Sequence, residues 1–392
     1  MKYQISITLL IFLFSIQLVS GQNNEIKLDR YFAKRMDKAQ VVGMQVGFLK
    51  SDGTIWTRSY GKKEHNSKLI VNDSTLFMIA SSSKPVTALA ILKLYDDQKL
   101  NLDTDINQYL PFQITNPNYL KQIITIRMLL SHTSSLKDNW EILEPLYTTD
   151  EGGDSSIQLK NFIEDYFTEK GKYYNTSANF FNKRPGSFWE YSNMGYALLG
   201  FIIEYTSGKE FSEYMKEDIF APLGMKNSYW FLKDIPHDNI AKPHVLPDEK
   251  SDSLKILPHY GYPDFPDGQL RTTTRDYLKF VRLILDEGKI DDKQFIDSGI
   301  IKQFHEVQYP GVHKYQAIAW NYDEFENWLY YLLFKRLPSH TGGDPGVATV
   351  ASYDPKNRIA AVVFMNSPPV TFKGGKILYL DIPKKLLKEA KK

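Results

Sequence analysis

Cysteine is absent from the whole 392-residue chain. Its absence excludes disulfide bonds, thiol nucleophiles and lipid attachment through a cysteine. Stability must therefore come from packing, for which a hydrophobic content of 42% is ample. A cysteine-free chain of this size suits a bacterial periplasm or exterior better than a small, disulfide-stapled secreted domain.

An excess of either charge is also lacking, because 48 Lys and Arg residues stand against 46 Asp and Glu residues. Neither sign forms a long block, which excludes the basic footprint of a nucleic-acid-binding protein. We therefore expect a small-molecule or short-peptide substrate, with cell-wall fragments among the candidates, and no nucleic-acid partner.

The apolar run near the amino end, residues 5–19, is shorter than the roughly 20 apolar residues that a membrane-spanning helix needs. It follows Lys2 and leads into Ser20, Gly21 and a polar stretch, which is typical of a signal peptide. We predict a signal peptide over residues 1–21 and a periplasmic or secreted mature protein. An uncleaved amino-terminal anchor is the alternative.

Hydrophobic periodicity predicts the order of elements. Residues 25–39 have the spacing of an amphipathic helix. An Asp-Gly pair between residues 44–50 and 55–60 predicts a hairpin of two strands. The middle of the chain favours helices and long loops. The remaining predicted elements are helices at 88–94, 196–205 and 382–392, strands at 317–321, 328–334, 348–353 and 359–366, and a turn at 354–357.

Strands from both ends of one chain usually pair in one sheet. We therefore expect an α/β protein of the α+β type, with an antiparallel sheet flanked by terminal helices and a mostly helical lobe. One continuous domain is expected over residues 22–392. Its sheet lobe is predicted at about 22–80 and 310–392, its helical lobe at about 81–309, and a cleft at their junction.

The pattern Ser-x-x-Lys occurs three times, at Ser59–Lys62, Ser81–Lys84 and Ser134–Lys137. Ser59 ends a predicted strand, where a residue three positions on faces the other way. Ser81 precedes an apolar helical run, and Pro85 fits the first turn of that helix. This geometry places Lys84 on the same face as Ser81. The alternative is a solvated helix cap with an ordinary surface lysine.

Such a pair suits nucleophilic catalysis by Ser81. A lysine takes a serine proton only if its pKa is depressed by burial or nearby positive charge, and we expect the helix amino terminus to supply both influences on Lys84. The free amide of Ser81 is a candidate donor to a substrate oxyanion.

The pattern Tyr-x-Asn occurs at Tyr173–Asn175 and at Tyr191–Asn193. The second copy follows a Pro-Gly pair and enters an apolar helix, so we expect it to be held rigidly. Tyr191 is a candidate general base and later acid, and Asn193 a partner for Lys84 or for a substrate amide. A buried tyrosine with a capping asparagine is the alternative.

A third element, His340-Thr341-Gly342-Gly343, lies just before a predicted strand. Two glycines allow the backbone to approach a substrate closely. The amide of Gly343 is a candidate second oxyanion donor, and Thr341 a candidate contact along the substrate backbone. A simple glycine turn is the alternative.

Together these elements belong to a longer ordered series of motifs. The series is Phe77–Lys84, Leu129–Leu136, Pro185-Gly186 with Tyr191–Asn193, Pro222–Met225, Asp267-Gly268 with Thr273–Asp276, and His340–Gly343. With it, the chain resembles the serine beta-lactamase and penicillin-binding-protein superfamily over about residues 25–366. The resemblance is strongest to the branch of class C beta-lactamases, D-aminopeptidases and related esterases.

The resemblance implies a beta-lactamase/transpeptidase-like fold and a role for each matching residue. Ser81 would be the nucleophile, Lys84 and Tyr191 the proton-handling pair, and Asn193 a positioning residue. The amides of Ser81 and Gly343 would form the oxyanion hole. No metal and no other cofactor are implied.

Two further points follow from the resemblance. The third Ser-x-x-Lys copy, at Ser134, falls in an element that looks like the family's structural loop. His340 replaces the family's usual lysine, and a histidine is mostly uncharged near neutrality. Capture of a substrate carboxylate should therefore weaken, which favours esterase or peptidase activity over efficient penicillin hydrolysis.

We therefore expect an exported serine hydrolase that forms an acyl-enzyme with an amide or ester, such as a D-amino-acid peptide, an ester or a beta-lactam-like substrate. A catalytically idle protein that binds peptidoglycan or a partner on the same fold is the alternative. A metallohydrolase built on His237, His244 and His259 is a weaker rival, because their spacing fits no compact zinc motif.

Residues 136–185 form a long stretch that is rich in aromatic side chains. We hypothesise that some of them shape the substrate pocket, while packing of a surface loop is the equal alternative. The aromatic residues are Trp140, Tyr147, Tyr166, Tyr173, Tyr174, Phe180 and Phe181.

Overall fold

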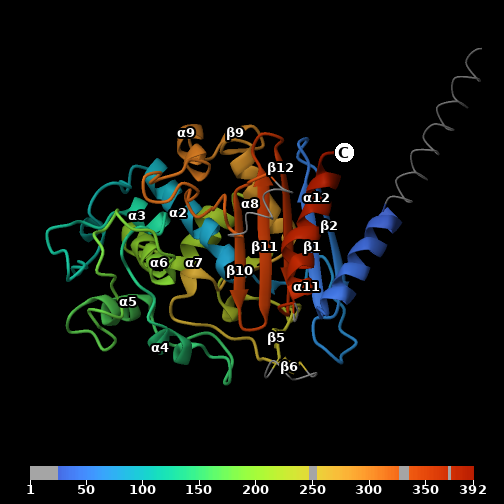
Figure 1. Cartoon of the computed structure of the whole chain (residues 1–392), viewed down its shortest axis with the longest axis horizontal. Coiled ribbons are helices and arrows are strands. Elements are labelled where there is room, and N and C mark those ends of the chain that lie inside the picture. Colours follow the sequence, from blue (N-terminus) through green and yellow to red (C-terminus); the bar gives the residue numbers. More distant parts are fainter. Residues whose placement is uncertain (1–24, 247–253, 326–334, 370–371) are drawn as a thin grey trace, which may run out of the picture.

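Both ends of the chain contribute strands to one five-stranded antiparallel sheet (Figure 1). The computed structural model describes residues 25–246, 254–325, 335–369 and 372–392. The strand order is β10-β11-β12-β1-β2. The strands are β1 (Gly43–Leu49), β2 (Ile55–Gly61), β10 (Ser339–Asp344), β11 (Val347–Asp354) and β12 (Ile359–Met365).

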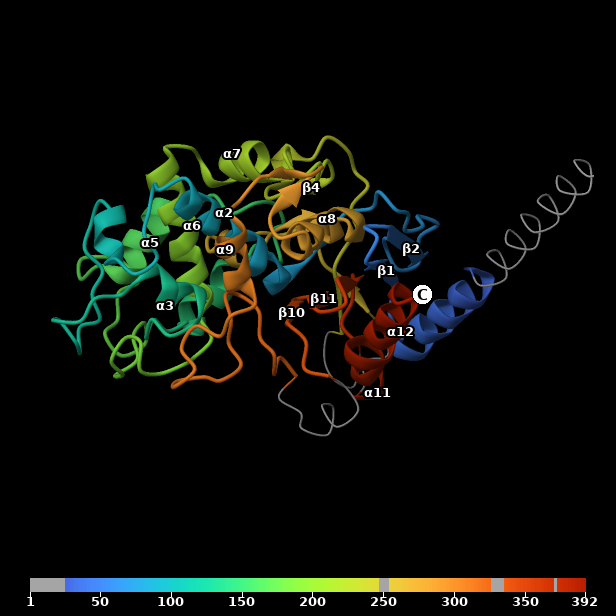
Figure 2. The same cartoon turned by 90° about the horizontal axis from the view of Figure 1, so that it is seen from above.

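Helices cover both faces of this sheet. A helix over residues 25–39 and α12 (Ile382–Ala390) pack on one face, and α8 (Thr274–Leu285) packs on the other (Figure 2). Side chains alternate between the two cores, so that Val363 joins the terminal helices and Phe364 joins the larger core. Every residue of β1 and β12 is buried as a result.

The helical lobe is centred on α2 (Lys84–Asp96), which packs against α6 (Asn193–Ser207). Both helices are rich in apolar residues and are buried on nearly all sides. The shorter helices are α3 (Ile126–Leu130), α4 (Trp140–Leu143), α5 (Leu159–Phe167), α7 (Phe211–Tyr214), α9 (Ser298–Ile301) and α11 (Phe372–Lys376). The shorter strands are β3 (Phe77–Met78), β4 (Ser228–Tyr229), β5 (His244–Val245), β6 (Lys255–Ile256), β7 (Arg271–Thr272), β8 (Lys289–Ile290) and β9 (Lys293–Gln294).

Most of the predicted elements are confirmed. The early hairpin is β1 and β2, the two late strands are β11 and β12 with residues 355–358 turning between them, and the terminal helices form as expected. The antiparallel sheet with flanking helices and a helical lobe is the predicted fold class.

The predicted strand at 317–321 is wrong. The chain turns back on itself there, because the amide of Ala317 donates to the carbonyl of Trp320 (2.9 Å) and Ala319 has a φ of +59°. Gln316 and Asn321 merely form an isolated bridge across this turn. The apolar residues that suggested a strand are instead buried as a tight turn.

Two predictions fall outside the described residues, namely the signal peptide at 1–21 and the strand at 328–334. In the part of the chain that the structure describes, no helix is both long enough and apolar enough to cross a bilayer.

The edge strand β10 faces the helical lobe (Figure 1). It packs against a short 3-10 turn, Ala80–Ser83, which leads directly into α2. This contact joins a strand from the end of the chain to the start of the central helix, and it brings the predicted site residues together.

Candidate active site

The turn that carries Ser81 is tied to the sheet on several sides. Thr349 on β11 donates from Oγ1 to the carbonyl of Ile79 (2.9 Å) and contacts Ser82 Oγ (2.9 Å). Ala80 has a φ of +49°, in the left-handed region that non-glycine residues seldom adopt. The surrounding hydrogen bonds hold this unfavourable conformation, which leaves Ser81 partly exposed on a fixed turn.

Lys84 lies one turn after Ser81 and is fully buried. Its Nζ lies 3.1 Å from Ser81 Oγ, 2.7 Å from Asn193 Oδ1, 3.0 Å from the carbonyl oxygen of Asp267 and 3.2 Å from Asp267 Oδ2. An ammonium has three hydrogens for these four oxygens. Ser81 Oγ is the one partner among them that can also act as a donor, so the Ser81–Lys84 contact can reverse direction.

Asp267 changes the charge state expected for Lys84. Burial lowers the pKa of Lys84, but the Asp267 carboxylate and the Tyr191 hydroxyl outweigh it and raise the pKa above the ordinary lysine value. The prediction of a depressed lysine pKa is therefore wrong for the unliganded protein. Burial in turn raises the pKa of Asp267 to about 6, against the opposing pull of Lys84.

Tyr191 places its ring beside the same ammonium, with Lys84 Nζ 4.9 Å from the ring centroid. His132 stacks on the ring at 4.4 Å and accepts a hydrogen bond at Nδ1 from the amide of Ser192 (3.2 Å). The Tyr191 hydroxyl is buried beside Lys84 and Ser81 and interacts with both, although within the described residues no contact to it has the geometry of a full hydrogen bond. Burial raises the pKa of Tyr191 to about 12, although Lys84 and Ser81 pull it down.

Asn193 is held at the first turn of α6 by a carboxylate. Asp138 accepts hydrogen bonds from Ser192 Oγ (3.1 Å), the amide of Asn193 (2.9 Å) and the amide of Met194 (3.0 Å). These are amides that the helix itself leaves without acceptors. Asp138 thereby fixes the Asn193 side chain on Lys84.

His340, Thr341, Gly342 and Gly343 lie within the edge strand β10. A Cβ on Gly342 would lie 2.3 Å from Thr349 Oγ1 and 2.4 Å from the carbonyl of Ile79, so only glycine lets the strand approach the Ser81 turn this closely. A Cβ on Gly343 would meet nothing within 4 Å. The strand is therefore close to the nucleophile at Gly342 and open at Gly343.

The backbone of β10 also orients an amide toward the open edge. The amide of Thr341 points away from β11, because it donates to Glu324 Oε1 (2.6 Å). Alternate residues of a strand share a direction, so the amide of Gly343 points to the same side. Ser81 contributes one of the first amides of a helical turn, which has no acceptor within that turn. The two residues that carry the predicted oxyanion donors, Ser81 and Gly343, both line the open space beside this edge, and their joint role as donors stays a prediction.

His340 is neutral in this setting. Burial, together with the charge of Lys84, lowers the pKa of His340 to about 3. Its Nδ1 lies 2.6 Å from the carbonyl oxygen of Thr341, which can only accept, so Nδ1 carries the hydrogen. The remaining ring nitrogen is then an acceptor, unlike the cationic donor that a lysine would supply.

Two hollows meet at Ser81. One, of about 320 Å³, is lined by His340, Thr341 and Glu324, and we call it the His340 side. The other, of about 420 Å³, is lined by Asn193, Asp267 and Asp344, and we call it the Asp344 side. Ser81, Tyr191 and Gly343 line both. A substrate lying across Ser81 would therefore extend into both hollows.

Some aromatic residues of the stretch 136–185 line the pocket, and others pack against the core. Trp140, Tyr147 and Phe181 line the Asp344 side. The others pack into or against the core, namely Tyr166, Tyr173, Tyr174 and Phe180.

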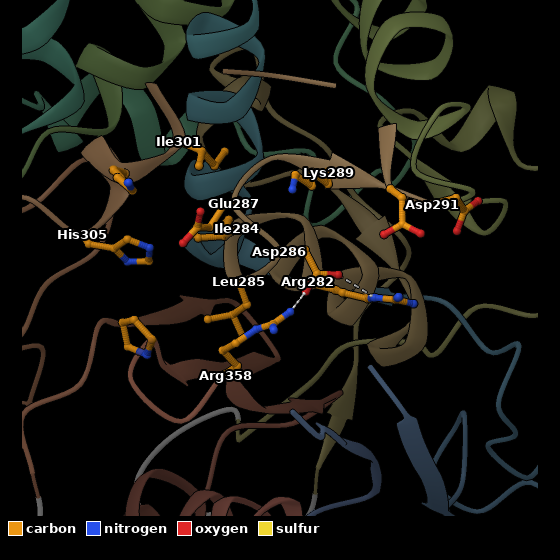
Figure 3. Close-up of a pocket in the computed structure, with 13 residues that line it drawn as sticks. Arg282, Ile284, Leu285, Asp286, Glu287, Lys289, Asp291, Ile301, His305 and Arg358 are labelled. Carbon is orange, nitrogen blue, oxygen red and sulfur yellow. Dashed lines mark hydrogen bonds and ion pairs between the residues drawn. The ribbon is translucent and has the colours of Figure 1, made fainter. Parts of the chain in front are cut away.

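A larger hollow of about 660 Å³ lies away from these residues (Figure 3). Its two arginines, Arg282 and Arg358, both bind the carboxylate of Asp286 (3.0 and 2.5 Å). Their positive charges are therefore already paired within the protein. No predicted site residue lines it.

The competing motif copies lie elsewhere. Ser59 is on β2, where its hydroxyl donates to Asp73 Oδ1 (2.8 Å). Ser134 is buried and accepts from the amide of Leu136 (3.4 Å).

The second histidine of the rival zinc set, His244, is buried and accepts a hydrogen bond at Nε2 from the amide of His65 (2.9 Å). Over the described ranges no group of three or more His, Cys, Asp or Glu residues is arranged to hold a metal ion.

Sequence reasoning missed four residues of the site. Asp138, Asp267 and His132 touch or orient the predicted residues, and Asp344 lines one of the hollows beside them, but none was a candidate. Asp267 and His132 were visible only as parts of motifs. Nothing in the sequence marked Asp138 or Asp344.

Comparison with known proteins places the chain among others of this architecture. The model of the family described as Beta-lactamase matches residues 28–382. The chain is 27% identical over 350 residues to penicillin-binding protein 4* of Bacillus subtilis, covering 84% of this chain and 69% of that protein. It is 25% identical over 346 residues to the protein flp of Staphylococcus aureus, covering 88% of this chain and 63% of flp.

The match therefore spans less than two thirds of the length of flp. Among solved structures, the D-amino acid amidase of Ochrobactrum anthropi SV3, complexed with D-phenylalanine, aligns with a TM-score of 0.69 at 21% identity. That alignment covers 93% of this chain and 99% of the amidase, and it shows a shared fold.

Proposed function

The chain belongs to the beta-lactamase family, and we propose that it is a serine hydrolase that cleaves an amide or ester through an acyl-enzyme on Ser81. One observation carries the proposal: Lys84 Nζ lies 3.1 Å from Ser81 Oγ and 4.9 Å from the centre of the Tyr191 ring. Ser81 and Tyr191 line both hollows, and Lys84 lies buried behind them in contact with Ser81, so a carbonyl bound at Ser81 would lie close to the other two side chains.

Acylation begins with Lys84 protonated and Asp267 ionised. Lys84 first passes one of its protons to Asp267 Oδ2, 3.2 Å away, and becomes a neutral amine. Ser81 Oγ then forms a bond to the substrate carbonyl carbon as its proton passes to Lys84 Nζ. The negative charge moves onto the carbonyl oxygen, where the amides of Ser81 and Gly343 stabilise it.

Tyr191 then serves the leaving group. Its hydroxyl makes no full hydrogen bond within the described residues, so its proton can pass to the leaving nitrogen or oxygen as the bond from the carbonyl carbon breaks. The tyrosinate regains a proton from Lys84, and Lys84 regains one from Asp267. Water repeats the sequence in place of Ser81 and releases the acid.

The His340 side favours substrates without a carboxylate at that end. A neutral histidine offers a substrate anion no charge, and Glu324 lies beside it with Oε1 3.9 Å from His340 Nδ1. This supports ester or peptide substrates over penicillins.

Covalent labelling tests the proposal. A fluorophosphonate probe should add to wild type and Ser59→Ala but not to Ser81→Ala, with the modified peptide located by mass spectrometry. A panel of nitrocefin, short-chain aryl esters and D-alanyl peptides then identifies the leaving groups. A folded wild type that neither labels nor turns over any of these would show a binding or scaffold protein instead.

Export belongs to the same proposal. The support is the apolar run and polar boundary in residues 1–21. Mass measurement of the protein recovered from outside the cytoplasm should give a chain beginning near Gln22, while an intact Met1 would contradict cleavage.

A further inference from the structure

The Asp344 side of the groove is rich in carboxyl groups. Asp138, Glu190, Asp267 and Asp344 all line it, against a single lysine, Lys137. That lysine is directed elsewhere, because its Nζ donates to the carbonyl of Ser177 (3.3 Å) and lies 5.5 Å from the ring centre of Phe181. Carboxyl groups therefore outnumber cations along this hollow.

Not all of these carboxyl groups are free to bind a ligand. Asp138 is occupied by the three hydrogen bonds that cap α6. Glu190 lies exposed at the rim. Asp267 and Asp344 differ from both, because each lies partly inside the hollow with one oxygen uncommitted.

In each of these two carboxyl groups one oxygen accepts a hydrogen bond and the other does not. Asp267 uses Oδ2 for Lys84, while its Oδ1 is buried with no hydrogen-bond partner among the described residues, and the side chain is 5% exposed. Asp344 uses Oδ2 to accept from the Tyr262 hydroxyl (2.9 Å). An unpaired buried carboxylate oxygen is costly unless a cation or donor reaches it.

The walls of the hollow suit a cation as well. Trp140, which is 49% exposed, lines it together with Tyr147 and Phe181. Tyr147 is held by stacking on Tyr262 at 4.3 Å, the same tyrosine that binds Asp344. Aromatic faces attract ammonium groups within about 6 Å, so charge and walls favour the same kind of ligand.

The electrostatics of the empty hollow point the same way. Burial, with the neighbouring Asp267, raises the pKa of Asp344 to about 8. The titratable groups around Asp344 are Tyr262, Tyr147, Tyr260, Asp264, Asp267 and Lys84, and Lys84 is the one cation among them. Lys84 already forms an ion pair with Asp267. A second cation bound in the hollow would therefore stabilise the ionised form of Asp344.

We propose that the Asp344 side binds the protonated amino group of the substrate, with Asp344 as its counter-ion. The substrates would then be amides or esters of amino acids, or short peptides, that carry a free ammonium group near the scissile carbonyl. This inference rests on the proposed hydrolase function and adds the substrate class. The aromatic walls would enclose the ammonium and any apolar side chain beside it.

Paired substrates test this inference. An aryl ester of an amino acid with a free amino group is compared with its N-acetylated form, on wild type, Asp344→Asn and Asp150→Asn. Asp150 is a charge-matched control, since it is an exposed residue paired with Lys255 (3.6 Å) and lines neither side of the groove. The rate on a neutral aryl acetate, which has no amino group, measures hydrolysis independently of the proposed amine site.

We expect wild type and Asp150→Asn to prefer the free amine at least tenfold in kcat/KM. Asp344→Asn should lose most of that preference while still cleaving the aryl acetate. Equal rates on the two esters in wild type, or an unchanged preference in Asp344→Asn, would overturn the amine site. Failure of wild type to cleave even the aryl acetate would instead overturn the hydrolase proposal.

A measurement on wild type avoids dependence on the variant's folding. Benzylamine and benzyl alcohol have similar shapes, and only the amine is charged near neutrality. Benzylamine should inhibit aryl acetate hydrolysis at least tenfold more strongly than the alcohol. Equal inhibition by the two would contradict the proposal.

Discussion

The buried ammonium of Lys84 lies 3.2 Å from the carboxylate of Asp267, a residue 183 positions later in the chain. The two side chains are 0% and 5% exposed. This ion pair sets the protonation of the lysine beside the nucleophile, and it gives the carboxylate a place in the proton path.

Replacing Asp267 should therefore change the pH dependence of catalysis. Burial raises the pKa of Asp267 to about 6, so acid protonates it and removes the acceptor for the Lys84 proton. Wild-type kcat/KM on a neutral ester should fall as the pH drops through about 6. Asp267→Asn should be slower and should lack that acidic limb. An identical acidic limb in the variant would assign it to another group.

The Tyr191 hydroxyl should matter for activity and not for stability. Its contacts with Lys84 and Ser81 fall short of full hydrogen bonds within the described residues, and Lys84 keeps its other oxygen partners. Tyr191→Phe should therefore change the unfolding free energy by less than about 1 kcal/mol. Loss of proton transfer should lower kcat by about 10²- to 10⁴-fold. Thermal unfolding and aryl ester kinetics measure the two effects. A large loss of stability would show that the hydroxyl forms a strong interaction with its neighbours, against this prediction.

Substitution by alanine should destabilise the protein at one of the two neighbouring glycines of β10 and not at the other. Gly342→Ala places a Cβ 2.3 Å from Thr349 Oγ1 and should cost about 1–3 kcal/mol by forcing β10 away from the Ser81 turn. Gly343→Ala meets no protein atom within 4 Å and should leave the melting temperature nearly unchanged. Equal melting temperatures for the two variants would contradict the close approach at Gly342.

A lysine at position 340 should restore affinity for carboxylates. The pKa of His340 is lowered to about 3, so the wild-type site has no charge to offer there. Glu324, 3.9 Å from His340 Nδ1, would partly balance the new cation beside Lys84. His340→Lys should raise kcat/KM about tenfold for a carboxylate-bearing ester relative to its methyl ester. An unchanged ratio in a folded variant would show that the carboxylate does not reach this position.

Much of the fold was predictable because its signals are local. The β1–β2 hairpin follows from an Asp-Gly turn, and α2 and α6 follow from apolar runs with a proline or a serine at the start. The error at 317–321 arose because a buried tight turn and a buried strand have the same apolar composition. Ser81, Lys84 and Tyr191 were found because short spacings and helix starts constrain them.

The acidic part of the site was not predictable in the same way. Asp138 lies in a loop, Asp267 ends a short 3-10 turn and Asp344 ends β10, and tertiary packing brings all three to the surroundings of Lys84 and Tyr191. Aspartates in such positions are usually turn residues, so nothing in their immediate sequence marks them.

The pairing of β10 with the Ser81 turn has a consequence for synthesis. The strand that presents Gly343 leaves the ribosome some 260 residues after Ser81, and it can add to the sheet only through β11 and β12. A nascent chain therefore carries its reactive serine without the second amide that would stabilise an oxyanion. Catalytic competence would begin only after β10, β11 and β12 have been made and paired, which delays hydrolysis until both sides of the cleft are present.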